Sequence, residues 1–552
     1  MGLQTRSLIP LTALVVVHVA LVYCLSALLR STDEFSISSA VIIALSTSLV
    51  LGSWKYAQNL LLLDFPGPIP YPIVGNILSL VAQGNVQEST RHLCKTYGPA
   101  VDIILTDGSR AVIVNDPLFC KTAIKSMDRG DLEGPNDHLN KFRENLLWFE
   151  IFSLKGLDLF SRSDKIGDWK TRRRILQPAF DQRHVRAMQK DINESIGSLL
   201  DKLAQTAVDN DGGFDVTPIL EDFGLEVLCK TSLGFHNDLI HNDSSRWLID
   251  HMKLATRLFS EYFFDPFVWL KIKVLAPIGL FPVENQRHAG GNRFRQFATA
   301  LFEKEKTRQN KEGSSKENLM SILFSISKEH MVDGFDDDAI VDEVVSFMFA
   351  GHDTTSTTLS VFLHYLAAYP AVQMKLHAHI DEALKGTNGD DFGDILKEHP
   401  LPFLSACIRE SQRLQPVAPI LPRRIQEDIP ISKQLLGGDT GKVVRKGSKV
   451  FVPCFLLHRD ETVYPDPELF QPERWIEGDG SLKPVTPGYF YAFGGGPKMC
   501  VGIQLAEKNL RMTSLGILSK FKVEPAANGI DLKIIDAFVT GPEYVRVKLS
   551  IR

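Results

Sequence analysis

Cys500 lies in a segment whose residue types favour metal binding. The segment reads FGGGPKMC over residues 493–500, with the cysteine at its end. Glycine reaches backbone angles closed to other residues, and proline fixes its own φ, so these residues predict a tight, rigid loop. Backbone N–H groups in such a loop would hydrogen-bond a thiolate, the form of cysteine that ligates a metal. The segment favours a sulfur held against a large, flat cofactor. The alternative is a glycine-rich turn with a buried free cysteine.

Trp169 and Arg173 are four residues apart in the basic segment WKTRRR, residues 169–174. On a helix this spacing places both side chains on one face. An indole N–H and a guanidinium on one face can clamp a carboxylate. Taken alone, the segment is better explained as a solvated basic helix.

Gly351, Asp353 and Thr354 interrupt a long apolar stretch, residues 337–368, that predicts a buried helix. Glycine weakens a helix interior by about 1 kcal/mol, and a threonine hydroxyl can bond the carbonyl four residues earlier and open the helix locally. The pattern predicts a groove beside a hydroxyl and an acid, two groups that can carry protons. The alternative is a set of polar residues at a contact between two helices.

Glu410 and Arg413 are three residues apart, so a helix would place their charges on one face. Such pairs usually lie at the surface and contribute a few tenths of a kcal/mol. The neighbours of this pair, Leu404, Cys407 and Leu414, are apolar. They favour burial, where a lone charge would be costly.

These motifs, in this chain order, resemble those of the cytochrome P450 superfamily. The resemblance runs from the proline-rich segment near residue 65 to the C-terminus, although residues 180–337 carry no signature. It implies that Cys500 is the axial thiolate ligand of the iron in haem b, iron protoporphyrin IX. It also implies haem contacts from residues around the ring and its propionates, namely Phe493, Lys498, Trp169, Arg173, Gly351 and Arg423. Lys498 stands where many members carry Arg or His, and lysine lacks their planar or bidentate geometry.

The resemblance assigns roles away from the iron as well. Asp353 and Thr354 match the pair that delivers protons. Glu410 and Arg413 match a buried pair that Arg474 completes, with a structural role. Such a chain would be a monooxygenase that inserts one atom of dioxygen into a lipophilic small molecule and reduces the other to water. The alternatives are a haem-thiolate isomerase or dehydratase, and a non-catalytic haem-binding protein.

The remaining sequence predicts a mainly α fold with small β-sheets, which by resemblance is the triangular helical cytochrome P450 fold. Residues 100–115 alternate in character and predict a β-hairpin. Residues 8–29 are apolar for long enough to cross a bilayer, and residues 37–54 form a second run that could span or lie in the interface. We expect a membrane anchor of one or two helices over residues 1–55, a proline-rich hinge over 56–80 and a haem-thiolate domain over 81–552.

The composition of the chain argues against several classes of partner and cofactor. The chain of 552 residues has a formal net charge of −5, which gives no electrostatic case for nucleic acid. Its seven cysteines include no CxxC pair, which argues against zinc and a disulfide framework. No strand–GxGxxG–helix fingerprint for flavin or nicotinamide appears, so electrons must come from a separate protein.

The predicted anchor favours the NADPH–cytochrome reductase of the endoplasmic reticulum membrane, with the catalytic domain facing the cytosol. Basic residues near the ligand side could form its docking patch or simply a solvated face: Lys165, Lys170, Arg172, Arg174, Lys508 and Arg511. Residues 259–269 are apolar and aromatic and match the roof of the cavity in the family. They favour a lipophilic substrate that enters from the membrane lipid, such as a lipid, terpenoid or polyketide. The sequence also looks like those of fungal members of the superfamily, which favours a role in secondary metabolism.

Overall fold

The computed structural model describes most of the chain from residue 63 onward. The described residues are 63–71, 75–105, 110–126, 169–236, 240, 247–254 without 249 and 253, 283–312, 318–330, 336–387, 391–425, 427–431, 442–527, 532–535 and 539–552. They fall into two compact units, one from residues 63–126 and 420–456 and the other from residues 169–419 and 457–552. The predicted anchor lies outside the described residues, as does part of the hinge. Within the described part of the chain, no helix has the length and apolar character needed to cross a membrane.

The first unit is built on a four-stranded sheet in the order β1-β2-β7-β4. Its strands are β1 (Ala100–Ile104), β2 (Arg110–Val114), β7 (Lys449–Pro453) and β4 (Ile420–Arg424). Strands β2 and β7 are parallel, and the other neighbours are antiparallel. The β1–β2 pair confirms the predicted hairpin, whose turn lies outside the described residues. Short elements complete the unit: α3 (Ile77–Val81), α4 (Val86–Tyr97), α5 (Pro117–Ser126), β5 (Ile429–Pro430) and β6 (Val443–Val444).

A buried acid fixes the start of the described chain to this sheet. Asp102 of β1 pairs with Arg110 of β2, with 2.7 Å between Oδ1 and Nε. Its Oδ2 also accepts hydrogen bonds from the backbone N–H groups of Asp64 and Phe65. Gly67 passes so close to the strand that an added Cβ would lie 2.1 Å from the carbonyl oxygen of Asp102. The segment that precedes the sheet is therefore held by charge and by close backbone packing.

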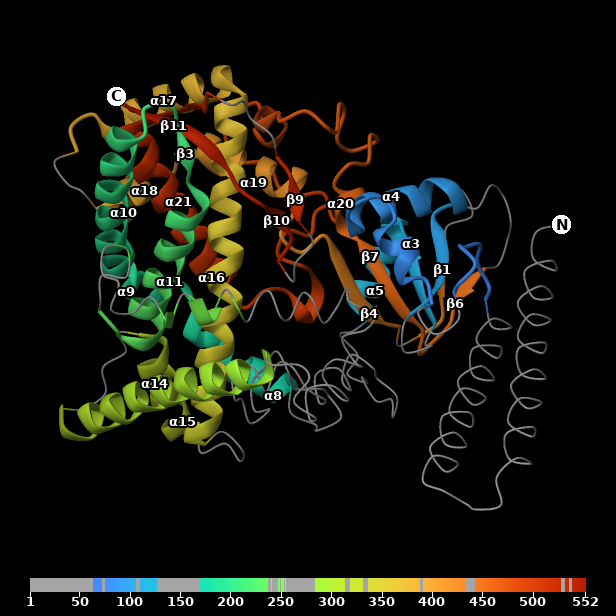
Figure 1. Cartoon of the computed structure of the whole chain (residues 1–552), viewed down its shortest axis with the longest axis horizontal. Helices are drawn as coiled ribbons and strands as arrows, with labels where there is room; N and C mark the ends of the chain where they lie inside the picture. The colour runs from blue at the N-terminus through green and yellow to red at the C-terminus, as the bar shows by residue number, and fades with distance from the viewer. Residues whose placement is uncertain are drawn as a thin grey trace, which may run out of the picture. The chain divides into compact units, whose positions relative to one another are not determined.

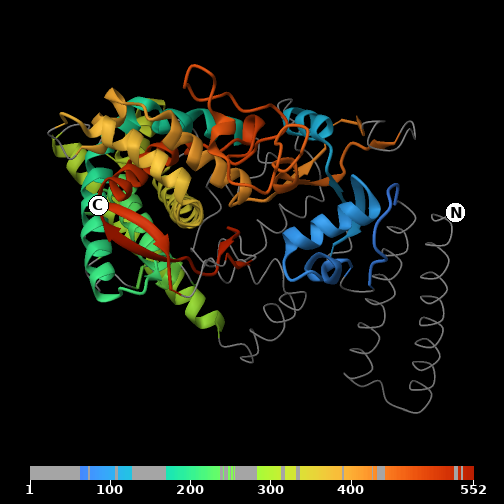
Figure 2. The same ribbon diagram turned by 90° about the horizontal axis from the view of Figure 1, so that it is seen from above.

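The second unit is mainly helical and surrounds α16 (Asp337–Ala368), the long yellow helix of Figure 1. Asp336 caps this helix by accepting a hydrogen bond from the N–H of Ala339, and acids in the first turn suit the helix dipole. The helix has the residue range that the sequence predicts. Helix α11 (Thr217–Leu233) packs along it, and α10 (Gln189–Asp209) packs against α11. Figure 2 views α16 nearly along its axis.

Further helices and small sheets complete the second unit. The helices are α8 (Trp169–Leu176), η3 (Gln177–Phe180), α9 (Gln182–Ala187), α14 (Val283–Glu312), α15 (Leu319–His330), α17 (Pro370–Leu384), α18 (Phe392–Glu398), α19 (Pro402–Leu414), η6 (Pro472–Trp475), η7 (Gly496–Lys498) and α21 (Ile503–Lys520). The strands are β3 (Phe214–Asp215), β8 (Phe521–Pro525), β9 (Ile534–Ile535), β10 (Gly541–Pro542) and β11 (Arg546–Ile551). Helix α20 (Cys454–Leu457) connects the two units along the chain. One hydrophobic cluster extends from α8 to β11. The mainly α fold with small sheets is confirmed.

Helix α16 stays helical through Gly351 and Thr354, where the sequence predicts a local opening. The predicted side-chain bond does form, because Oγ1 of Thr354 donates to the carbonyl of Ala350 at 2.9 Å. Most residues on both sides of this turn are buried. Their packing outweighs a weakening of about 1 kcal/mol.

Candidate active site

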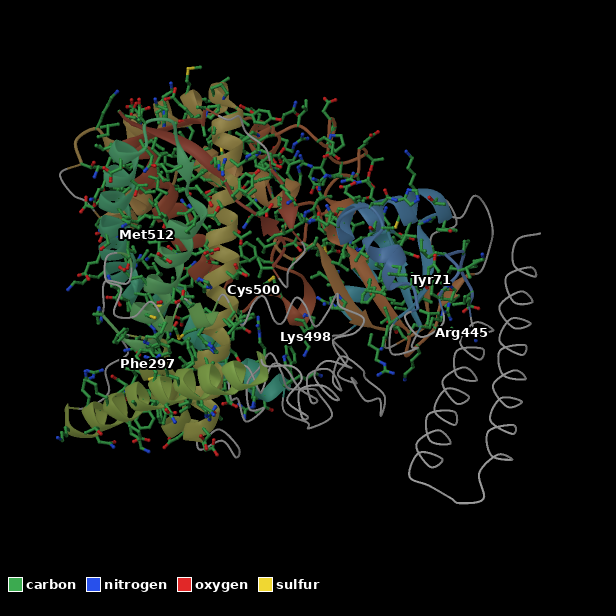
Figure 3. The ribbon with its side chains drawn as sticks, viewed as in Figure 1. Tyr71, Phe297, Arg445, Lys498, Cys500 and Met512 are labelled. Atoms are coloured by element: carbon green, nitrogen blue, oxygen red, sulfur yellow. The ribbon has the colours of Figure 1, made fainter. Side chains whose placement is uncertain are left out.

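Cys500 ends a loop whose turns require glycine. Gly494 and Gly496 have φ of 71° and 63°, in the left-handed region that other residues rarely adopt. The N–H of Cys500 donates to the carbonyl of Phe493 at 2.9 Å, which closes the loop. Helix α21 begins three residues later, with Gly502 as its N-cap. Figure 3 labels Cys500 and Lys498 in this loop. The tight turns that the sequence predicts for this loop are present.

Cys500 is an exposed residue, unlike the buried free cysteine that the sequence left as an alternative. Protein atoms around the thiol raise its pKa by desolvation, while a hydrogen bond from the backbone of Gly502 and the charge of Arg173 lower it. Burial in turn lowers the pKa of Arg173, and Cys500 raises it. A cation and an amide N–H thus already face the position where a thiolate charge would lie.

Helix α8 brings Trp169 and Lys498 together. The Nζ of Lys498 lies 3.3 Å from the centroid of the Trp169 ring, a cation–π contact. Trp169 is buried and Arg173 is half-buried on the same helix. The structure therefore joins Trp169, Arg173, Lys498 and Cys500 in one place. The sequence did not indicate the contact between lysine and indole.

Asp353 and Thr354 are half-buried on α16, and the close approach of α11 explains the glycine beside them. A Cβ added to Gly351 would lie 3.1 Å from Leu228 of α11. The converse holds for Gly224 of α11, where an added Cβ would lie 3.1 Å from the carbonyl oxygen of His352. The glycines let the two helices approach closely. The sequence offered two alternatives here, and a helix–helix contact accounts for Gly351 without deciding the roles of Asp353 and Thr354.

Glu410 is the centre of a buried polar network. Its carboxylate accepts two bonds from Arg413, at 2.8 and 2.9 Å, one from Arg474 at 3.0 Å and one from the indole of Trp475 at 2.8 Å. The backbone N–H of Gln471 donates a further bond at 2.9 Å. Glu410 and Arg413 have no exposed surface. The structure brings the three predicted residues together, and their burial agrees with the apolar neighbours in the sequence.

His458 extends this network to the cysteine loop, and the sequence did not indicate it. The backbone N–H of Tyr491 donates to its Nε2 at 2.8 Å. Nδ1 therefore carries the proton and donates to the carbonyl of Arg413 at 3.2 Å. Burial lowers the pKa of His458 to about 3. Tyr491 also accepts a bond from the N–H of Gly494 at 2.9 Å, so the neutral imidazole connects Arg413 to the loop.

Arg423 lies in the first unit, on β4, where it is opposite Val450 of β7. Its Nη1 donates to the carbonyl of Pro422 at 2.8 Å. Its charge lowers the pKa of Cys454, although burial raises that pKa more strongly. A haem contact from Arg423 stays a prediction.

The candidate docking residues fall into different environments. Lys170 and Arg174 are exposed on α8, while Arg172 is buried in an ion pair. Lys508 is half-buried and donates to Gln189 at 2.7 Å. Arg511 donates to the backbone carbonyl of Pro400, and Lys165 lies outside the described residues. A solvated patch on the described part of the chain is therefore centred on α8.

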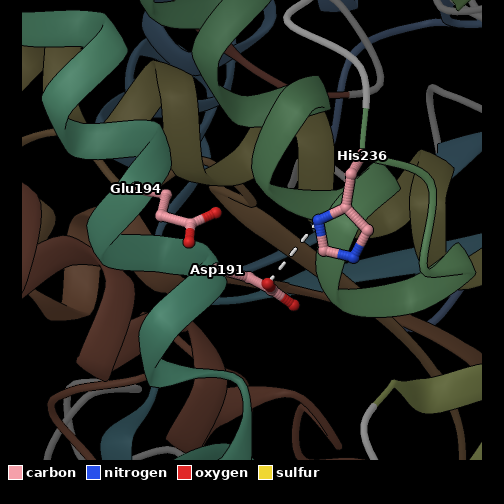
Figure 4. A group of neighbouring side chains, drawn as sticks. All are labelled: Asp191, Glu194 and His236. Carbon is pink, nitrogen blue, oxygen red and sulfur yellow. Dashed lines mark ion pairs between the residues drawn. The ribbon is translucent and has the colours of Figure 1, made fainter.

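A second titratable cluster lies away from the cysteine loop (Figure 4). It consists of Asp191 and Glu194, one turn apart on α10, and His236, which follows α11. Nδ1 of His236 is 3.8 Å from Oδ1 of Asp191. Burial raises the pKa of Asp191, and His236 lowers it. Glu194 and His236 are exposed, and a surface ion pair accounts for this geometry without a metal.

The residues around Cys500 fit haem b. Cys500 is an exposed residue whose sulfur could bind iron, while the other described cysteines are buried or half-buried. Arg173 and Lys498 are cations of the kind that would pair with the two carboxylates of the ring. The rigid loop holds the sulfur at a fixed position. The donor set is therefore that of a haem-thiolate centre.

Comparison with known proteins agrees with this geometry. The family model for cytochrome P450 matches residues 65–549. Cytochrome P450 3A31 of Mesocricetus auratus is 27% identical over 514 residues, which cover 90% of this chain and 92% of the relative. Cytochrome P450 3A29 of Sus scrofa is 26% identical over 519 residues, which cover 92% and 95%. The match thus extends over almost the whole of each chain.

Proposed function

Since the chain belongs to the cytochrome P450 family of haem b monooxygenases, we propose that Cys500 is the thiolate that binds the haem iron and that the enzyme oxidises a lipophilic small molecule. The observation that carries this proposal is Cys500 itself, an exposed residue in a closed, glycine-dependent loop, beside the N–H of Gly502 and the charge of Arg173. Bound haem supplies the activation of dioxygen. The protein supplies binding, orientation and protons.

The roles of the surrounding residues follow from their contacts. Arg173 and Lys498 bind the carboxylates of the ring, and the contact of Lys498 with Trp169 keeps the lysine on that side. We assign a further carboxylate contact to Arg423, and contacts with the ring itself to Phe493 and Gly351. These assignments rest on the family pattern.

Asp353 and Thr354 hold and deliver protons in this proposal. Oγ1 of Thr354 donates to the carbonyl of Ala350, so its lone pairs are available to accept a hydrogen bond from a bound water or substrate. Rotation about χ1 would turn the same hydroxyl into a donor toward the active centre. Asp353, the adjacent half-buried acid, would then restore the proton from solvent.

Glu410, Arg413 and Arg474 have a structural role in the proposal. Their hydrogen bonds hold the segment around residues 458–475 in place. His458 links this segment to the loop of Cys500, because it accepts a hydrogen bond from the N–H of Tyr491. None of these residues would touch substrate.

The wider setting is also proposed. A microsomal enzyme with an anchor in its first 55 residues would receive electrons from NADPH–cytochrome reductase at the endoplasmic reticulum membrane. Its substrate would enter from membrane lipid, and a role in secondary metabolism of a fungus would suit the style of the sequence. The exposed Lys170 and Arg174 are the residues we assign to reductase docking.

The test is the absorption spectrum of the reduced carbon monoxide complex, for the wild type, for Cys500→Ala and for a control, Cys454→Ala. We expect the red-shifted band of a thiolate ligand in the wild type and the control, and its loss in Cys500→Ala. A wild type without that band, or a Cys500→Ala variant that keeps it, would refute the assignment.

A turnover assay on a panel of lipophilic metabolites separates the monooxygenase from its rivals. Incorporation of one labelled atom from ¹⁸O₂, dependent on NADPH and reductase, is the expected result. Conversion without dioxygen would indicate an isomerase or dehydratase instead. Tight binding of a lipophilic ligand with no product would indicate a haem-binding protein.

A further inference from the structure

Helix α8 carries a buried arginine, Arg172, whose side chain contacts α16. Nη1 of Arg172 lies 3.3 Å from Oε1 of Glu343 on α16. The two side chains are 1% and 0% exposed, although they are 171 residues apart in sequence. A charged pair so fully removed from water must be matched in geometry, because either charge alone would be strongly destabilising there.

The faces of α8 separate two kinds of contact. Trp169 and Arg173 share the face that meets the cysteine loop, because Trp169 contacts Lys498 and the charge of Arg173 acts on the thiol of Cys500. Arg172 is about 100° around the helix from Arg173. It therefore points to α16 while its neighbours point to the sulfur.

A second contact joins the same two segments. Phe180 of η3, which continues α8, meets Phe347 of α16 edge to face, with 5.1 Å between ring centroids. Glu343 and Phe347 are four residues apart, so they form one face of α16. Phe180 also borders the cysteine loop, since a Cβ added to Gly502 would lie 3.9 Å from its ring.

We propose that Arg172 and Glu343 are a positioning pair that fixes α8 between the cysteine loop and α16. By fixing α8, the pair sets the positions of Trp169 and Arg173 relative to Lys498 and the sulfur of Cys500. It also holds α8 against α16, the helix that bears Asp353 and Thr354. Apolar side chains of similar volume would stabilise the fold as well or better, so the ion pair serves to select one placement of the helix. This inference rests on the proposed function, because it concerns how the protein holds haem at Cys500.

The adjacent residue of α16 provides a matched control. Asp342 is also 0% exposed and pairs with Arg295 of α14. Arg295→Met removes the pair with Asp342 on the same turn of α16, together with the pair to Asp338, without a direct effect on α8. Effects specific to α8 can thus be separated from a general loss of stability.

The experiment compares Arg172→Met, Glu343→Gln and the apolar double variant Arg172→Met/Glu343→Leu with the control Arg295→Met. The measurements are the rate of haem transfer to apomyoglobin, the reduced carbon monoxide spectrum and Tm. In both single variants we expect haem transfer to quicken by about tenfold, equivalent to about 1.4 kcal/mol, and a fraction of the carbon monoxide complex to lose the thiolate band. The control should lower Tm but change haem transfer less than about twofold.

The double variant keeps the test decisive if a single variant does not fold. It removes both charges of the pair, so we expect a Tm close to that of the wild type together with rapid haem transfer. Wild-type haem transfer and spectrum in the double variant would overturn the proposal, as would an equal effect in Arg295→Met. A wild type without the thiolate band would instead overturn the proposed function.

Discussion

Lowering the pH from 7 to 5 is expected to destabilise this protein more than a variant in which His458 cannot take up a proton. The folded chain holds the neutral imidazole, because Tyr491 donates to Nε2 and Nδ1 donates to the carbonyl of Arg413. A second proton on Nε2 would break the bond from Tyr491 and place a charge in a site that is fully buried. His458→Asn keeps a neutral donor near the position of Nδ1 and has no proton to gain.

The size of the effect follows from the two pKa values. His458 has a pKa of about 3 in the fold against 6.5 in the unfolded chain. Between these values the unfolded state binds more protons, so the free energy of unfolding falls as the pH falls. The contribution is fully present above pH 6.5 and is lost progressively toward pH 3. At pH 5 the unfolded chain gains about 2 kcal/mol from protonation of this histidine, and at pH 7 it gains about 0.2 kcal/mol.

Urea unfolding at both pH values, followed by far-UV circular dichroism, measures this difference. The loss of unfolding free energy between pH 7 and pH 5 should be about 2 kcal/mol smaller in His458→Asn than in the wild type. His458→Asn should itself be less stable at pH 7, since the N–H of Tyr491 loses its acceptor, at a cost of about 1–3 kcal/mol. The exposed His399 supplies the control, and His399→Asn should keep the wild-type pH dependence. Equal losses in the wild type and His458→Asn would refute the reasoning.

Three further substitutions test the network and the central helix. Glu410→Gln leaves Arg413 buried without its counter-charge and should lower the free energy of unfolding by about 3–5 kcal/mol; chemical denaturation checks this, and a loss below about 1 kcal/mol would contradict it. Thr354→Val removes the hydroxyl at nearly constant volume and should lower product formed per NADPH consumed several-fold, with hydrogen peroxide released in its place; unchanged coupling would exclude this hydroxyl from proton delivery. Gly351→Val forces a side chain against Leu228 and should cost about 1–3 kcal/mol; Leu228→Ala in the same chain should restore part of that loss, and an additive effect of the two changes would argue against a clash.

The sequence predicted those features of the structure that depend on residues close together in the chain. The range of α16 follows from an apolar run that begins after a capping acid, Asp336, and stops before Pro370. The loop of Cys500 follows from glycines that the positive φ angles require. The burial of Glu410 and Arg413 follows from their apolar neighbours. In each case the deciding residues lie within a few positions of one another.

Residues whose partners are distant in sequence could not be found in the same way. His458 bonds to residues 45 and 33 positions away, and no spacing rule connects it to either. The close approach of Leu228 to Gly351 comes from another helix, and no spacing in the sequence indicates it. Such contacts exist only once the helices have packed, so a single sequence does not contain them in readable form.

The basic segment of α8 shows why charge patterns need a structure to be interpreted. Lys170 and Arg174 are exposed, Arg173 is half-buried beside the cysteine, and Arg172 is buried against Glu343. In sequence these residues form one cationic run, and neither a solvated helix nor a carboxylate clamp describes all of them. The periodicity of the helix distributes the charges to solvent, to the sulfur and to α16, because successive residues point about 100° apart. A helix of only eight residues therefore directs its charges to solvent, to the cysteine loop and to α16.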